Sequence, residues 1–421
     1  MLKGAAAVAV PSFVSAAFSK SKAAGLSDES NKAVEDEAFW RDVANAYDVR
    51  RNVINLENGY WGVMARPVAE RYIEQLKRVN YNNSYYARRS YNEDLASVGG
   101  ALAALLGAAP EEIALTRGAT EALKTLITGY NRLKQGDAVL YADLDYGSMQ
   151  AMMDWRAAQS GGEVIRLAIP EPATHDGLIA FYKKALEDNP SVKLLLLTHI
   201  SHRTGLVVPV KEIVAMARAA GVDCIVDAAH SWGQMDFDAS DLGADFIGFN
   251  LHKWIGAPVG AGIVYIKQDR LADIDPDPAA DAWARDHITG RVHTGTANFA
   301  AYLTIPEALK FHLEVGPARK AARLAYLRNL WVHASRNLPG LQILAPDDPR
   351  LHAAITSFRS DGKISAEDNI ALAARLLDEF NIYTVHRTGV AGGACVRATP
   401  ALYNSADDVA ALARALKTIY G

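Results

Sequence analysis

Between residues 110 and 265 the chain alternates short apolar runs with amphipathic segments, and this rhythm constrains its fold more than any other feature. The runs Ala138–Tyr141, Leu194–Thr198 and Cys224–Val226 are typical of buried strands, whereas Leu178–Leu186 and Val210–Ala220 are typical of helices. Strands that alternate with helices predict a mostly parallel sheet with helices on both faces. Because ligands bind such sheets at the carboxyl ends of the strands, we expect the functional residues just after the apolar runs.

The pattern changes near residue 305, where a long helical stretch leads into a smaller unit. Strands and helices are expected in this unit near Ala354–Phe358, Ile382–His386, Ala394–Ala398, Asn369–Phe380 and Ser405–Ile419, with Ser405 as an N-cap. We therefore predict three parts: a leader over residues 1–30, an N-terminal segment and large domain over 31–305, and a small C-terminal α+β domain over 306–421.

The first 30 residues differ in composition from the rest of the chain. The run from Gly4 to Phe18 is small and apolar, and a short Ser/Lys stretch follows it. This order resembles the apolar core of an export signal, and the start of the chain resembles the tail of a twin-arginine signal. We therefore expect an exported, periplasmic protein; the alternative is a leader without a sorting role on a cytoplasmic protein.

Charge and cysteine content argue against several classes of function. The formal net charge of −4 argues against a nucleic-acid-binding surface and against a polybasic membrane patch. Apart from the leader, no stretch approaches the ~20 apolar residues of a spanning helix, so we expect no stable membrane anchor. The two cysteines, Cys224 and Cys395, form no CxxC pair, so we expect neither a disulfide framework nor a metal site.

A lysine follows one of the apolar runs. Lys253 comes after the run Phe246–Phe249 and before a turn rich in glycine and proline. A lysine at the end of a buried strand is costly without a partner, and desolvation lowers the pKa of its amine. A lowered pKa suits an amine that must attack an aldehyde, so Lys253 is a candidate catalytic residue.

Two further elements follow other strands. Asp227 ends the run Cys224–Val226, where a carboxylate suits the pyridine nitrogen of pyridoxal phosphate (PLP), whose protonation makes the ring an electron sink. At Gly118 a strand ends and a helix begins, and the free N–H groups of a helix N-terminus suit a phosphate. Each element alone also fits an ordinary capped turn, but together they predict a PLP site.

With these motifs the chain resembles the class V aminotransferase superfamily of PLP enzymes, and within it the isopenicillin N epimerase-like group. The resemblance covers about residues 50–420 and keeps the family order: GATEAL, an aromatic ring-stacker, a polar turn, DAAH, and HK before a glycine turn. It implies the aspartate-aminotransferase fold (fold type I), an α/β fold with a large domain and a smaller C-terminal domain. It also implies PLP, a small amino-acid-type substrate, and a homodimer whose subunits share the active site.

The resemblance implies a role for each matching residue. Lys253 is expected to form the Schiff base and move protons, Asp227 to pair with the pyridine nitrogen, and His230 to contact the phenolic oxygen. Tyr146 stands where the family often has a ring-stacking histidine, and His202 stands where relatives often have asparagine beside the phenolic oxygen.

The remaining matches concern the phosphate of PLP and the substrate. The phosphate is expected to contact Gly118, Ala119, Thr120, Asn250, His252 and, from the neighbouring subunit, Thr296. The substrate is expected to contact Arg387, Arg397 and Asn58; Asn58 lies in an N-terminal loop, directly before Gly59. Arg397 matches the arginine that takes the substrate α-carboxylate, a group that suits its bidentate fork.

The sequence leaves the reaction open. Transamination requires only Lys253 to carry a proton, whereas epimerisation needs a second donor on the opposite face, for which Tyr146, His202 and Tyr85 are candidates. A desulfurase needs a nucleophilic cysteine on a mobile loop, but Cys395 looks strand-bound and Cys224 looks like a core residue. We favour an aminotransferase or epimerase acting at the α-carbon of an amino acid or aminoacyl group. A PLP-dependent lyase (C–S lyase or desulfurase-like) and a non-catalytic PLP-fold protein are the alternatives.

Overall fold

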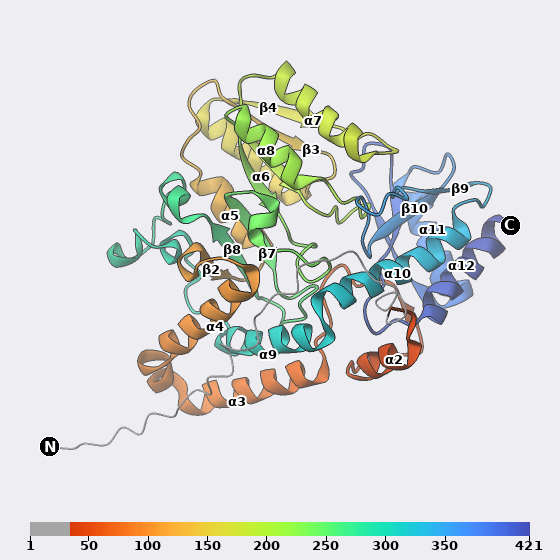
Figure 1. The fold of residues 1–421 in the computed structure, drawn as a ribbon, viewed down its shortest axis with the longest axis horizontal. Coiled ribbons are helices and arrows are strands. Elements are labelled where there is room, and N and C mark those ends of the chain that lie inside the picture. The colour runs from red at the N-terminus through yellow and green to blue at the C-terminus, as the bar shows by residue number, and fades with distance from the viewer. Residues whose placement is uncertain (1–33) are drawn as a thin grey trace.

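A computed structural model of the chain describes residues 34–421; the expected leader lies outside them. Its main feature is a seven-stranded sheet with the strand order β2-β8-β7-β6-β5-β3-β4 (Figure 1). These strands are β2 (Ile113–Thr116), β3 (Ala138–Ala142), β4 (Glu163–Leu167), β5 (Val192–Thr198), β6 (Asp223–Asp227), β7 (Phe246–Asn250) and β8 (Gly262–Ile266). The neighbours from β4 to β7 pair in parallel, and β8 pairs antiparallel with β7 and β2. The prediction of a mostly parallel sheet is confirmed.

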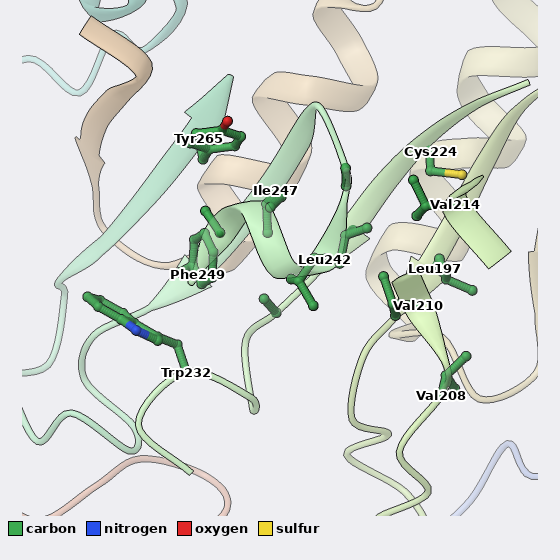
Figure 2. Close-up of a cluster of buried hydrophobic side chains, with 14 of the residues drawn as sticks. Leu197, Val208, Val210, Val214, Cys224, Trp232, Leu242, Ile247, Phe249 and Tyr265 are labelled. Atoms are coloured by element: carbon green, nitrogen blue, oxygen red, sulfur yellow. The ribbon is translucent and has the colours of Figure 1, made fainter. Parts of the chain in front are cut away.

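Helices cover both faces of this sheet, which explains why its central strands are mostly apolar. One face packs against α4 (Tyr91–Leu106), α7 (His175–Asp188), α8 (Val210–Ala219) and α9 (Phe299–Val315). The other face packs against α5 (Ala119–Gly129) and α6 (Gly147–Ser160). Figure 2 shows part of the apolar cluster on the first of these faces, in which Cys224 lies among aliphatic side chains such as Leu197 and Val214.

The N-terminal segment contributes helices and one loop near the sheet. It contains α2 (Glu37–Asn45), the short strand β1 (Ile54–Asn55) and the long helix α3 (Arg66–Arg89). Helix α3 runs alongside α9, below the large sheet in Figure 1. The loop between β1 and α3 lies against the turn that carries Lys253, since the Gly62 N–H donates to the His252 carbonyl at 2.8 Å.

The C-terminal part, drawn in blue to one side of the large sheet in Figure 1, is built on a four-stranded antiparallel sheet. Its strand order is β12-β13-β10-β9, and it has its own apolar core with helices on it. These elements are α10 (Pro317–Ser335), β9 (Leu341–Ile343), β10 (Thr356–Ser360), α11 (Ala366–Phe380), β11 (Ile382–Tyr383), β12 (Val385–Arg387), β13 (Cys395–Ala398) and α12 (Ala406–Tyr420). Ser405 caps α12 by accepting the Asp408 N–H at 3.1 Å, as predicted.

Two expected strands differ in detail from the structure. The run Ala354–Phe358 begins β10 only at Thr356, because Ala354 is instead buried against the large unit, where its N–H donates to the Gln234 side chain at 2.7 Å. The run Ile382–His386 splits at Thr384: β11 pairs in parallel with β1, whereas β12 pairs antiparallel with β13. Apolar character predicted burial correctly in both places but not the partner that buries the residues.

Short 3-10 helices connect several of these elements, at Pro110–Glu112, Ala239–Leu242, Gln268–Asp273, Ala282–Ala284 and Ile288–Arg291. Over residues 34–421, no helix is both long and apolar enough to cross a membrane. In the same residues no group of three or more His, Cys, Asp or Glu side chains is placed to hold a metal ion.

Candidate active site

A cleft of about 1240 Å³ opens at the carboxyl ends of β5, β6 and β7, where the sheet topology predicts a ligand site. Turns that follow these strands line it, together with the start of α5 and residues from β12 and β13. Of the residues predicted from the sequence, those in its lining are Gly118, Ala119, Thr120, Tyr146, His202, Asp227, His230, Asn250, His252, Lys253, Arg387 and Arg397.

Lys253 lies in the turn after β7 with its amine directed at a histidine. Its Nζ is 2.9 Å from Nε2 of His230, which lies in the turn after β6. Desolvation is the main cause that lowers the pKa of Lys253 from 10.5 to about 8, and Arg397 and Arg387 lower it further while Asp227 opposes them. At neutral pH most of this amine is still protonated, but its unprotonated, nucleophilic fraction is much larger than that of an ordinary lysine.

Asp227 ends β6 inside the same cleft. Its Oδ1 accepts the Ala229 N–H at 2.9 Å. Burial raises the pKa of Asp227 above its usual value, while the bond from Ala229 and the charge of Lys253 lower it. A cation placed in the cleft would offset the cost of burying this carboxylate, so its position fits a protonated pyridine nitrogen.

The start of α5, where the phosphate is expected, packs closely against two side chains at the end of β7 and in the turn after it. A Cβ at Gly118 would lie 2.8 Å from Asn250 Oδ1 and 2.9 Å from His252 Cε1, so only glycine allows these side chains to approach the turn. Asn250 Oδ1 accepts the Ala119 N–H at 2.7 Å, and His252 Nδ1 lies 2.9 Å from the Ala261 carbonyl oxygen. The Ala119 N–H therefore already has a partner, and Thr120, which lines the cleft, is the better placed of the two for a phosphate.

The two predicted substrate arginines share an acid that the sequence did not suggest. Arg397 Nη2 donates to Glu57 Oε1 and Oε2 at 2.6 and 2.7 Å, and its Nη1 donates to the His202 carbonyl at 2.6 Å. Arg387 Nη2 lies 3.4 Å from Glu57 Oε1. The Arg397 side chain is only 1% exposed and that of Arg387 is 24% exposed, so Arg387 is the more open cation.

Glu57 belongs to the loop between β1 and α3, which covers Arg397 closely. A Cβ at Gly59 would lie 2.5 Å from Arg397 Nη2, so glycine is required for this approach. Asn58 does not line the cleft as expected: its amide donates to the Thr399 carbonyl at 2.9 Å, behind the loop. Gly59 and Tyr60 line the cleft in its place.

Two of the three candidates for a second proton donor lie in the cleft. The rings of Tyr146 and His202 meet edge to face, with centroids 5.4 Å apart and planes at 88°. Burial and the charges of four neighbouring basic residues, the nearest in sequence being Arg203, lower the pKa of His202 to about 2. Tyr85 is 72% exposed on α3 and lies outside the lining of the cleft, so within this chain it does not face Lys253.

Thr296 also lies outside the cleft. It is exposed in the segment that leads into α9. Its expected contact was with the phosphate of a neighbouring subunit, and this placement leaves its side chain accessible to such a partner. That contact stays a prediction.

These features fit PLP part by part: a reactive amine for the aldehyde, a buried carboxylate for the ring nitrogen and a glycine cradle at a helix start for the phosphate. A model of the family "Aminotransferase class-V" matches residues 65–412. The chain belongs to this family. As a class V enzyme it uses PLP, and the resemblance drawn from its motifs is confirmed.

Relatives of this class V enzyme differ in their reactions. This chain is 28% identical over 407 residues to isopenicillin N epimerase of Streptomyces clavuligerus, and the match covers 91% of this chain and 99% of the relative. It is 29% identical over 335 residues to a cysteine desulfurase of Yersinia pestis, covering 74% of this chain and 79% of the relative. A putative L-cysteine desulfhydrase of Oryza sativa subsp. japonica is 33% identical over 195 residues, 43% of this chain and 39% of the relative.

Solved structures share its fold. A lysine-to-alanine mutant of C-DES with glycine covalently linked to PLP superposes with a TM-score of 0.77 at 24% identity, covering 90% of this chain and 99% of that one. The apo cysteine desulfurase from Thermococcus onnurineus NA1 gives a TM-score of 0.77 at 20% identity, covering 90% and 97% of the two chains. The predicted fold type I architecture is confirmed, and the relatives leave the reaction open.

Proposed function

We propose that the protein is an aminotransferase or epimerase that acts at the α-carbon of an amino acid or aminoacyl group, with Lys253 as the Schiff-base residue. The observation that carries this proposal is the amine of Lys253, whose lowered pKa and 2.9 Å contact with His230 place a reactive base in a cleft built for PLP. Bound PLP supplies an electron sink for the bond that breaks at the α-carbon.

The remaining roles in the reaction, proton transfer and substrate binding, are assigned to different residues of the cleft. Asp227 keeps a proton on the pyridine nitrogen, and Lys253 removes or returns the proton at the α-carbon from its own side. Arg397 remains the proposed partner of the substrate carboxylate, and Arg387, the more open cation, assists it; without substrate both arginines face Glu57. Tyr146 is the better candidate for the donor on the opposite face that only epimerisation requires, because the lowered pKa of His202 leaves its ring neutral.

The alternative is a lyase that breaks a C–S bond. The relatives named L-cysteine desulfhydrase and the structural neighbour described as a cystine C–S lyase favour this candidate. A desulfurase that uses its own cysteine is disfavoured by Cys224 in the core and by Cys395 in β13, both buried. The β12–β13 loop is also held in place, because its Ala391 N–H donates to Asp143 Oδ2 at 2.7 Å and Arg203 donates to the Gly389 carbonyl at 2.9 Å.

Two further parts of the proposal concern assembly and location. We propose a homodimer in which Thr296 reaches the phosphate site of the partner, supported by its exposure outside its own cleft. Sedimentation at several concentrations tests the dimer, and a Thr296→Ala variant with weakened PLP affinity would support the shared site. We also propose export, supported by the apolar run from Gly4 to Phe18; cell fractionation of the full chain, with the protein appearing in the cytoplasm only, would refute it.

The first experiment records the visible spectrum of the purified protein, reduces it with borohydride and maps the modified peptide. An absorption band that borohydride bleaches, with the pyridoxyl group on Lys253 and no band in Lys253→Ala, supports the proposal. A label on another lysine, or no band after PLP is added, refutes it.

A second experiment separates the reactions. The holoenzyme is incubated with individual amino acids in D₂O and the products are identified. Inversion with deuterium at the α-carbon indicates epimerisation, and a keto acid formed together with an aminated cofactor indicates transamination. Sulfide with pyruvate from cysteine indicates the lyase and would reject the favoured reaction.

A further inference from the structure

Trp254 follows Lys253 directly in the chain, yet its indole contacts a different residue of the cleft. Its Nε1 donates to Nδ1 of His230 at 3.3 Å, and the other ring nitrogen of His230, Nε2, lies 2.9 Å from Lys253 Nζ. An indole N–H can only donate, so Nδ1 of His230 must accept. A neutral imidazole whose Nδ1 accepts carries its proton on Nε2, so the His230 N–H points toward Lys253 Nζ, which accepts it when the amine is unprotonated.

Burial and the basic groups around His230 keep its ring neutral. Lys253 and His202 face it from the turns after β7 and β5, and Arg387 and Arg397 face it from β12 and β13. Burial, followed by these basic groups, holds the pKa of His230 well below its ordinary value. The acids of the site raise the pKa of Lys253: Asp227, which lies three residues before His230, and Glu57, which lies in the β1–α3 loop. Which of the two ring nitrogens carries the single proton is therefore the property that decides what His230 can donate to.

Trp254 and His230, the two partners of the 3.3 Å hydrogen bond, are both held in place by their surroundings. Trp254 is buried in an apolar cluster, and its carbonyl accepts from the buried ammonium of Lys320. A Cβ at Gly233 would lie 2.8 Å from the carbonyl carbon of Trp254, so glycine allows the turn after β6 to pack on the turn after β7. The His230 carbonyl is fixed in turn by the Gln234 side chain, which donates to it at 2.6 Å.

We propose that Trp254 is a positioning residue that fixes His230 as the tautomer protonated on Nε2, so that this N–H donates to the phenolic oxygen of PLP. The inference rests on the proposed function, because it takes Lys253 as the Schiff-base residue. In PLP the phenolic oxygen is attached to the ring carbon next to the one that bears the aldehyde. A donor 2.9 Å from Lys253 Nζ is therefore within reach of that oxygen.

A proton-sensitive spectrum follows from this arrangement. A hydrogen bond to the phenolic oxygen stabilises its negative charge, so the nitrogen joined to the cofactor holds its own proton less tightly. Without Trp254 both tautomers of His230 become accessible, and part of this donation is lost. The nitrogen should then keep its proton to higher pH.

The first test is a pH titration of the visible band in the holoenzyme. Trp254→Phe should raise the midpoint by about half a unit to one unit, the value of one neutral hydrogen bond. Trp331→Phe is the matched control, since Trp331 is a buried indole of the C-terminal core whose Nε1 has no partner among the described residues. The midpoint of this control should match that of the wild type.

A second variant separates donation from packing. His230→Ala removes the N–H donor altogether, so adding Trp254→Phe to it should leave the midpoint unchanged. If Trp254→Phe shifted the midpoint equally in the wild type and in His230→Ala, Trp254 would act through packing alone, and the proposal would be overturned. A failure of the proposed function is recognised separately, by the absence of a borohydride-sensitive band on Lys253 in the wild type.

A third measurement reads the tautomer directly and needs no variant at Trp254. The holoenzyme is labelled with ¹⁵N-histidine, and the His230 signals are identified by their loss in His230→Gln. A proton on Nε2 and a bare Nδ1 support the proposal. A proton on Nδ1 in the wild-type holoenzyme refutes it.

Discussion

Replacing Lys253 by methionine in the PLP-free protein should stabilise the fold at neutral pH. Desolvation, with contributions from Arg397 and Arg387, lowers the pKa of Lys253 from 10.5 to about 8. Each pKa unit corresponds to about 1.36 kcal/mol, so lowering this pKa from 10.5 to about 8 costs at most about 3.4 kcal/mol, and water in the cleft reduces this cost. Methionine fills a similar volume without a charge and avoids this cost.

The sign of the pH dependence follows from the lowered pKa of Lys253. Below pH 8 the amine is protonated in the folded and unfolded chains alike, so the full cost is present. Between pH 8 and 10.5 the unfolded chain binds more protons than the folded chain, so the wild type gains stability as pH rises. The advantage of Lys253→Met should therefore shrink, by about 1 kcal/mol from pH 7 to pH 9.

Urea unfolding of the PLP-free wild type and Lys253→Met at pH 7 and pH 9 measures this difference. Any change in packing affects both pH values equally, so the change between them reports the protonation of Lys253, including its effect on the bond to His230. Lys211→Met, at an exposed position on α8, is the control and should show no such change. An advantage of equal size at both pH values would refute the reasoning.

Three further predictions test other parts of the site. Gly118→Ala should weaken PLP binding about tenfold to a hundredfold, measured by absorbance titration, because the added methyl group overlaps two side chains of the β7 turn. Glu57→Gln should lower the free energy of unfolding by about 3 kcal/mol in urea, because it leaves the buried charge of Arg397 unpaired; a change below about 1 kcal/mol would contradict this. Iodoacetamide should label neither Cys224 nor Cys395 in the folded protein, as read by mass spectrometry, since both are buried and burial raises the pKa of each thiol; rapid labelling of Cys395 would reopen the desulfurase interpretation.

The fold was largely predictable because its signals are local. Each central strand contains a continuous apolar run, and a run of that kind indicates a strand that is buried on both faces of a sheet. The strand-end rule then placed Asp227 and Lys253 together, although they belong to different turns. The family resemblance added the arginines and the phosphate turn, which composition and periodicity alone could not assign.

What the sequence did not predict depends on partners that are distant along the chain. Glu57 is one acid among many in the sequence, and its role follows only from Arg397, which β13 brings against it from 340 residues away. Trp254 carries no signal of its own in the sequence, and its bond to His230 depends on how closely two turns pack at Gly233. Asn58 was expected in the substrate pocket, but its amide is turned toward the carbonyl of Thr399.

Desolvation is the main cause of the lowered pKa of Lys253, and partners distant along the chain adjust it further. Arg387 and Arg397 lower the pKa of Lys253, whereas Asp227 and Glu57 raise it. Three of these four charges belong to the β1–α3 loop or the C-terminal strands, not to the sheet that carries Lys253. A shift of those strands away from the sheet would remove the two arginines and return the amine toward its ordinary, protonated state. The docking of the C-terminal part therefore both shapes the substrate pocket and helps to keep the pKa of Lys253 low.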